Sequence, residues 1–236
     1  MILKTLVVGP LEVNCYILGD EKTKEAVCID PGGDVDEVMA ELENAKFCLK
    51  YIINTHGHFD HVGGNAVLKK TTGAKFAIHK DDAVLLENVA SQSAVFGLDA
   101  VSSPPPDLFL KDGDEIRVGN MAIEVIHTPG HTRGGICLFI NPPVSPFNKG
   151  GQKGDFDKGG LGRFSDQKKI LFTGDTLFAG SIGRTDLPGG SYKDLIASIK
   201  NKILPFGDDV KIFPGHGSET TIGRERKFNQ FLMDIK

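Results

Sequence analysis

Short apolar runs alternate along this chain with stretches of helical period. Five runs in its first part have the length and apolar character of β-strands: residues 2–8, 13–18, 25–29, 49–54 and 75–78. Three segments between or after these strands repeat their apolar positions every three or four residues, which predicts helices at residues 34–44, 66–72 and 83–88. Residues 91–107 have no such period and contain three consecutive prolines at 104–106, so we expect irregular backbone there.

The second part of the chain has the same kinds of element. Strands are predicted at residues 108–110, 114–118, 121–126, 136–140, 169–173 and 210–213. Helices are predicted at residues 192–204 and 222–235. Two sets of strands bury their apolar faces best against each other, with helices outside. The sequence therefore predicts an α+β fold, a two-sheet sandwich covered by helices.

Residues 141–169 interrupt this pattern. They are rich in Pro, Gly, Lys and Phe, have no hydrophobic period, and repeat FNKGG at 147–151 as FDKGG at 156–160. We interpret them as a low-complexity insertion in a hairpin loop. Because lengthening a loop costs little free energy, we expect one domain over residues 1–236 that carries this insertion.

Four metal-binding side chains lie in residues 55–61 (THGHFDH), directly after the predicted strand 49–54. In extended backbone, residues two apart point the same way, so His56 and His58 can hold one ion. Asp60 and His61 come after the chain has bent and can reach a second ion. Histidine and carboxylate without thiolate are the ligands of zinc, iron or manganese.

Four side chains cannot complete two sites, so the remaining ligands must lie further along the chain. Three candidates follow predicted strands and stand beside Gly or Pro: His131, Asp175 and His216. We assign the first ion to His56, His58 and His131, the second to Asp60, His61 and His216, and a bridging position to Asp175. This arrangement uses five of the seven histidines, which makes a chance distribution a poor explanation.

Three other residues near these loops are considered as well. One of them has two possible roles, and the other two are interpreted as structural. Asp30 ends the predicted strand 25–29 and either supports the metal loop from behind or bonds its own turn. His79 stands without ligand spacing, so we interpret it as a packing or helix-entry residue. His127 is expected to pack beside the loop that presents His131.

Charge, apolar runs and cysteines limit the classes of function and the location that we expect. The net charge of −4 predicts no basic surface, so we expect a small-molecule substrate rather than nucleic acid, and nothing indicates an obligate protein partner. The first ten residues do not resemble a signal peptide, and no apolar run is long enough to span a membrane. The four cysteines lack a Cys-x-x-Cys pair and are read as reduced thiols, so a cytoplasmic location is expected.

Residues 55–61, followed in order by His131, Asp175 and His216, resemble the metallo-β-lactamase superfamily. The segments GDTLF (174–178), GRTD (183–186), GHG (215–217) and TTIG (220–223) look like its glyoxalase II-like branch of hydroxyacylglutathione hydrolase-related proteins. Only 20 residues follow His216, too few for the helical domain that holds glutathione in glyoxalase II, so the chain is similar to the short members.

This resemblance implies an αββα sandwich with two divalent metal ions at one edge of the sheets. Zinc is favoured, with iron or manganese as alternatives. It also implies hydrolysis of a thioester, such as S-lactoylglutathione, by a metal-bridging hydroxide. Asp60 and Asp175 would be the catalytic carboxylates.

Two points stay open at this stage. Arg184 stands where the family places a basic substrate contact, but it could equally form a local ion pair with Asp186. The superfamily also includes mononuclear iron persulfide dioxygenases, in which one Fe(II) would be held by His56, His131 and Asp175. That reaction is the alternative function.

Overall fold

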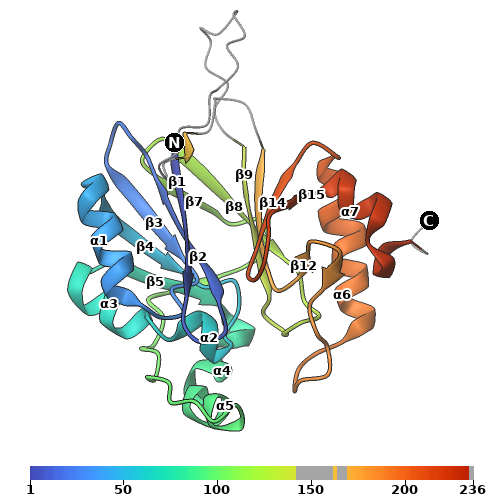
Figure 1. The fold of residues 1–236 in the computed structure, drawn as a ribbon, viewed down its shortest axis with the longest axis horizontal. Coiled ribbons are helices and arrows are strands. Elements are labelled where there is room, and N and C mark those ends of the chain that lie inside the picture. Colours follow the sequence, from blue (N-terminus) through green and yellow to red (C-terminus); the bar gives the residue numbers. More distant parts are fainter. Residues whose placement is uncertain (142–161, 164–168, 234–236) are drawn as a thin grey trace, which may run out of the picture.

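A computed structural model describes residues 1–141, 162–163 and 169–233. Its layers follow the order helices, sheet, sheet, helices (Figure 1), which confirms the αββα sandwich. The first sheet has the strand order β10-β1-β2-β3-β4-β5-β6. Its strands are β1 (Ile2–Val8), β2 (Val13–Gly19), β3 (Glu25–Ile29), β4 (Cys48–Ile53), β5 (Lys75–His79), β6 (Leu108–Leu110) and β10 (Gly162–Arg163).

The second sheet has the strand order β15-β14-β11-β9-β8-β7. Its strands are β7 (Glu115–Val118), β8 (Met121–His127), β9 (Ile136–Ile140), β11 (Ile170–Gly174), β14 (Lys211–Pro214) and β15 (Thr220–Thr221). A separate short hairpin, which the sequence did not predict, consists of β12 (Leu177–Phe178) and β13 (Ser181–Ile182).

The helices lie outside the sheets. Those of the first half are α1 (Val35–Ala45), α2 (Phe59–Val62), α3 (Asn65–Thr72), α4 (Ala83–Glu87) and α5 (Val89–Val95), and those of the second half are α6 (Tyr192–Ser198) and α7 (Ile222–Phe228). Ser191 and Thr221 cap α6 and α7 by accepting hydrogen bonds from backbone N–H groups three residues on. No helix in the described ranges is long and apolar enough to cross a membrane.

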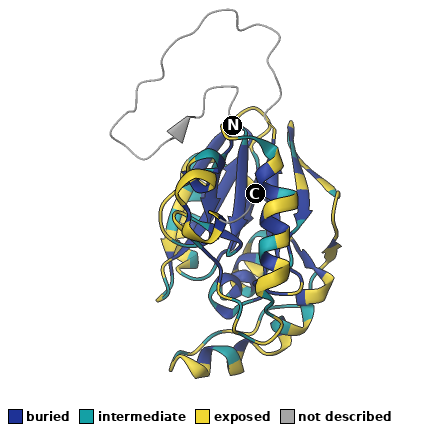
Figure 2. Ribbon diagram, turned by 90° about the vertical axis from the view of Figure 1, so that its right-hand side faces the viewer, coloured by how far each residue is buried: buried dark blue, intermediate teal, exposed yellow. Residues whose placement is uncertain are grey.

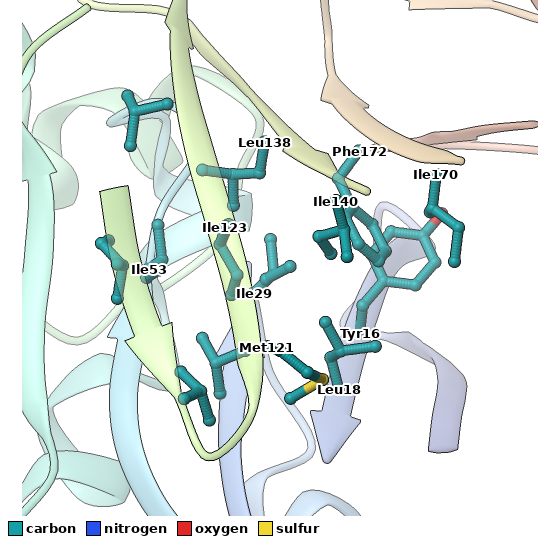
Figure 3. Packing of buried hydrophobic residues seen from close by; sticks show 14 of the residues in the cluster. Tyr16, Leu18, Ile29, Ile53, Met121, Ile123, Leu138, Ile140, Ile170 and Phe172 are labelled. Carbon is teal, nitrogen blue, oxygen red and sulfur yellow. The ribbon is translucent and has the colours of Figure 1, made fainter. Parts of the chain in front are cut away.

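Three apolar clusters join the layers. The central cluster lies between the two sheets and includes Leu18, Ile123 and Phe172 (Figure 3). Ile17, the neighbour of Leu18, belongs instead to the cluster under α1 and α3, because successive side chains of a strand point to opposite faces. The third cluster packs the second sheet against α6 and α7. Figure 2 shows the strands buried and the outer helix faces exposed.

The structure corrects three predicted boundaries. Part of the expected loop at 91–107 is helical, because α5 continues to Val95. The helix predicted at 192–204 is α-helical only to Ser198 and continues as a π-helical turn, Ile199–Ile203. The helix predicted at 222–235 ends at Phe228, because the backbone of Asn229 is extended and its side chain caps a new 3-10 turn. Most of the insertion at 141–169 lies outside the described residues.

Candidate metal centre

The loops that follow β4, β8, β11 and β14 meet at one edge of the two sheets. They bring together all seven side chains that the sequence singled out. One group with metal-binding atoms within 4.8 Å of one another contains His56, His58 and His131, and a second contains Asp60, His61 and His216. The grouping is the one that the sequence predicted for the two ions.

Asp175 lies between the two groups. Its Oδ1 atom is 3.5 Å from Nε2 of His61, and its Oδ2 atom is 3.6 Å from Nε2 of His131 and 3.7 Å from Nε2 of His216. One carboxylate therefore presents an oxygen to each group. This is the placement that a bridging ligand requires.

Hydrogen bonds orient the histidine rings. Nδ1 of His131 lies 2.8 Å from the carbonyl oxygen of Arg184, which can only accept, so Nδ1 carries the proton and Nε2 keeps its lone pair. Thr55 Oγ1 donates to Asp30 and so accepts from Nδ1 of His56, which leaves Nε2 of His56 free as a ligand. Both Nε2 lone pairs belong to the group that would hold the first ion.

Buried atoms without hydrogen-bond partners test whether a cation fits. Among the described residues these include Nε2 of His56, Nε2 of His61 and Oδ1 of Asp175, which together form a third group of metal-binding atoms. Polar atoms buried in this way cost free energy unless something binds them. Nitrogen lone pairs and carboxylate oxygens are the donor set of a divalent ion, so the residues fit such an ion.

The pKa values agree with a centre that binds cations. Burial lowers the pKa of His56, and burial together with His131 lowers the pKa of His58 to about 3, so both rings are neutral ligands. Burial alone would lower the pKa of His61, but the carboxylates of Asp60, Asp175 and Asp30 raise it to about 10. The negative charge that holds a proton on His61 would equally attract a metal ion.

Asp30 supports the metal loop, one of the two roles that the sequence left open. Its carboxylate accepts hydrogen bonds from the backbone N–H and the hydroxyl of Thr55, each at 2.7 Å. Its Oδ2 atom also lies 3.1 Å from Nδ1 of His61. One buried carboxylate thereby orients ligands from both groups.

Sequence reasoning missed Asp82, whose fully buried carboxylate joins two metal loops. It accepts hydrogen bonds from the backbone N–H of Gly57 at 3.0 Å, from the Thr132 hydroxyl at 2.7 Å and from the backbone N–H of Gly134 at 2.6 Å. Gly57 separates His56 from His58, and Thr132 follows His131. Asp82 sits in the run Lys80-Asp81-Asp82, where no spacing distinguishes it from its exposed neighbour.

The loop that carries His216 is tied to the first sheet, a second feature that the sequence did not reveal. Asn14 donates side-chain hydrogen bonds to the carbonyl oxygens of Pro214 and Gly217, and Tyr16 donates to Pro214 at 2.6 Å. A side chain at Gly215 would collide with Oδ1 of Asp175. Position 215 therefore requires glycine for the loop to approach the centre.

The remaining candidates lie around this centre. The exposed side chain of Arg184 forms a two-pronged ion pair with Asp186 at 2.7 and 2.8 Å, which is the local pairing that the sequence allowed. His79 accepts a hydrogen bond at a helix entry, as predicted, and its ring stacks on that of His127. His127 also contacts the carbonyl oxygen of Arg133, so it supports the loop that presents His131.

Comparison with protein families gives one match that covers most of the chain. The family model of the metallo-beta-lactamase superfamily matches residues 8–142 and 160–216. These residues include the six side chains of the two groups and Asp175.

Two curated proteins and one solved structure are similar over most of this chain. Hydroxyacylglutathione hydrolase GloC of Haemophilus influenzae is 36% identical over 234 residues, covering 98% of both chains. The mitochondrial persulfide dioxygenase of Homo sapiens is 30% identical over 222 residues, which are 92% of this chain and 70% of that protein. The structure of TTHA1623 in a di-iron-bound form has a TM-score of 0.77 and 31% identity, covering 97% of this chain and 99% of that one.

Proposed function

The chain belongs to the metallo-beta-lactamase superfamily, and from this premise we propose that it is a two-metal hydrolase of small thioesters such as S-lactoylglutathione. The observation that carries the proposal is the convergence of six side chains in two groups of three, with the carboxylate of Asp175 between them. The similarity to a hydroxyacylglutathione hydrolase over the whole length supports the thioester substrate.

In this proposal, the ligands of the first ion are His56, His58 and His131. Those of the second ion are Asp60, His61 and His216, and Asp175 contributes to both. Histidine and carboxylate ligands favour zinc, with iron or manganese as alternatives. The similar chain in a di-iron form supports keeping iron among these metals.

Divalent ions in such a centre supply a water of pKa near 7 and polarise the carbonyl group. Asp60 orients the attacking water by accepting one of its hydrogen bonds; its Oδ2 atom lies 3.4 Å from His216, at the centre of the second group. The water would lose one proton to solvent and attack as hydroxide. Its oxygen bonds to the carbonyl carbon, the carbon–sulfur bond breaks with its electron pair passing to sulfur, and the carboxylic acid product releases the second proton. A thiolate is a good leaving group, so a strong general acid is not required.

Arg184 is proposed to bind a carboxylate of the thiol carrier. Its backbone carbonyl is held by His131, which places the residue beside the first group. Its guanidinium already holds one carboxylate, that of Asp186, in a two-pronged arrangement. A substrate carboxylate can take the same geometry.

The test measures hydrolysis of S-D-lactoylglutathione by the full chain together with its metal content. We expect about two metals per chain and turnover that a chelator abolishes. His58→Ala should abolish turnover while leaving the circular dichroism spectrum unchanged, because His58 is a ligand at the surface of the centre. Full turnover in that variant would overturn the two-metal proposal. Hydrolysis of a β-lactam, without hydrolysis of the thioester, would refute the proposed substrate class.

The second candidate function is oxidation of a persulfide by one iron. The observation that favours it is the 30% identity with a persulfide dioxygenase over 92% of this chain. One iron per chain, oxygen uptake with glutathione persulfide and no thioester hydrolysis would establish this alternative and refute the hydrolase.

A further inference from the structure

A cavity of about 240 Å³ lies beside Asp60. It is lined by the turn between β1 and β2, the loop after β3, helix α2 and residues 98–101, and it opens to solvent. Figure 1 shows α2 and α5 together at the end of the first sheet where these segments meet. Because Asp60 lines the cavity and also belongs to the second ligand group, the cavity adjoins the reacting centre.

The lining of this cavity is mostly apolar, and within the described ranges its only charged side chains are the carboxylates of three aspartates. Leu11, Phe59, Leu98 and Val101 supply apolar walls, and the exposed Asp34 and Asp99 add negative charge. Of the described residues that line it, none is lysine or arginine. An apolar group gains free energy by leaving water here, whereas an anion would meet like charge without a partner.

The size of the cavity sets a bound on the group that it can hold. An engineered protein cavity of about 150 Å³, lined by apolar side chains, binds benzene. At about 240 Å³ this cavity has room for a phenyl ring with a short linker. Phe59 lines the cavity and is otherwise buried in the apolar cluster beneath α2, where its ring packs 5.3 Å from the ring of Phe96.

We propose that this cavity is the acyl-side specificity pocket of the enzyme. It accepts uncharged apolar acyl groups up to the size of phenylacetyl and rejects acyl groups that end in a carboxylate. The inference rests on the proposed thioester hydrolysis, and it orients the substrate. The acyl group lies toward Asp60 and the second ligand group, and the thiol carrier lies toward Arg184, which adjoins the first group through His131.

The test compares three thioesters of one thiol: S-acetyl-, S-phenylacetyl- and S-succinylglutathione. We expect kcat/KM of the metal-loaded enzyme to be at least about tenfold higher for phenylacetyl than for succinyl. Val101→Lys places a cation in the lining and should reverse this preference, raising succinyl turnover about tenfold and lowering phenylacetyl turnover. This gain of activity cannot come from a poorly folded protein.

Val67→Lys is the matched control. Val67 is also an exposed valine, with 47% of its surface accessible against 58% for Val101, but it lies on α3 outside the lining. The control should leave all three rates unchanged within about twofold, since surface substitutions have small effects. An equal response of the two variants, or no preference among acyl groups in the unaltered enzyme, would overturn the pocket.

A binding measurement separates this inference from the proposed reaction. Phenylacetamide, an uncharged analogue of the acyl product, is titrated calorimetrically into the metal-free full chain, with acetamide as its comparison. We expect binding of phenylacetamide only, weakened by Val101→Lys and not by Val67→Lys. Binding without thioester turnover would keep the pocket and refute the proposed function. Thioester turnover without binding of phenylacetamide would keep the proposed function and refute the pocket.

Discussion

Replacing Asp82 with Asn tests whether one buried carboxylate holds two metal loops together. The substitution keeps the shape of the side chain but turns one oxygen into a donor. If the remaining oxygen keeps its hydrogen bonds from Gly57 and Thr132, the new NH2 group replaces the oxygen that lies 2.6 Å from the backbone nitrogen of Gly134. Two hydrogen-bond donors then face each other. At least one hydrogen bond to a charged acceptor is lost, which is worth about 1.5–3 kcal/mol.

Two further effects shift that magnitude in opposite directions. The other two hydrogen bonds weaken, because bonds to an ionised acceptor are roughly twice as strong as neutral ones. Against this, burial raises the pKa of the Asp82 carboxyl, so removing its charge recovers desolvation free energy. We expect a net loss of about 2–4 kcal/mol. For a chain of this length, that lowers Tm by roughly 4–16 °C.

The assay has two readouts. Thermal unfolding of chelator-treated protein measures the effect on the fold alone. Competition with a chromophoric chelator measures zinc affinity, which we expect to fall about 10–100-fold because the loops of His56, His58 and His131 lose their common support.

Asp81→Asn is the matched control, since Asp81 is the neighbouring, exposed aspartate. It should change stability by no more than about 0.5 kcal/mol. Equal Tm values and equal zinc affinities for the two variants would refute the role assigned to Asp82.

Three further predictions concern pH, the anchored loop and the metal. Burial alone would raise the pKa of Asp20, but hydrogen bonds from Asn120 and nearby backbone lower it below 3.8, so its stabilisation is present above that pH and lost as the pH falls. Asp20→Asn should therefore reduce the fall in the free energy of unfolding, measured with urea, as the pH is lowered below about 4. An unchanged pH dependence would contradict this. Tyr16→Phe should lower the free energy of unfolding in urea by about 0.5–1.5 kcal/mol, because the Pro214 carbonyl loses one of its two side-chain hydrogen bonds and keeps that from Asn14; a loss near zero would refute the anchor. Chelation should lower Tm, and added zinc should restore it, because zinc at a free concentration of 1,000 Kd adds about 4 kcal/mol to the free energy of unfolding. An unchanged Tm would contradict metal binding.

The sequence predicted the layers well because each strand and helix has its own local pattern of apolar positions. The sequence prediction was wrong where a helix ends although its apolar period continues. Residues 222–235 keep helical spacing, yet Asn229 leaves the helix, and its buried side chain donates to the backbone carbonyl of Ser181 on the distant strand β13 and to the carboxylate of Glu225 within α7. The short β12–β13 hairpin was missed for a similar reason: two-residue strands carry no alternation to detect.

The sequence by itself determined the two sets of strands and the seven candidate metal ligands. Both are local properties: apolar periodicity, and an unusual density of histidine beside Gly and Pro at strand ends. Only the tertiary structure decided which other residues complete the centre. Asp82 contacts positions 25 and 50 residues away, and Asn14 reaches a loop 200 residues along the chain. Such pairings arise when the two sheets pack, so no single stretch of sequence records them.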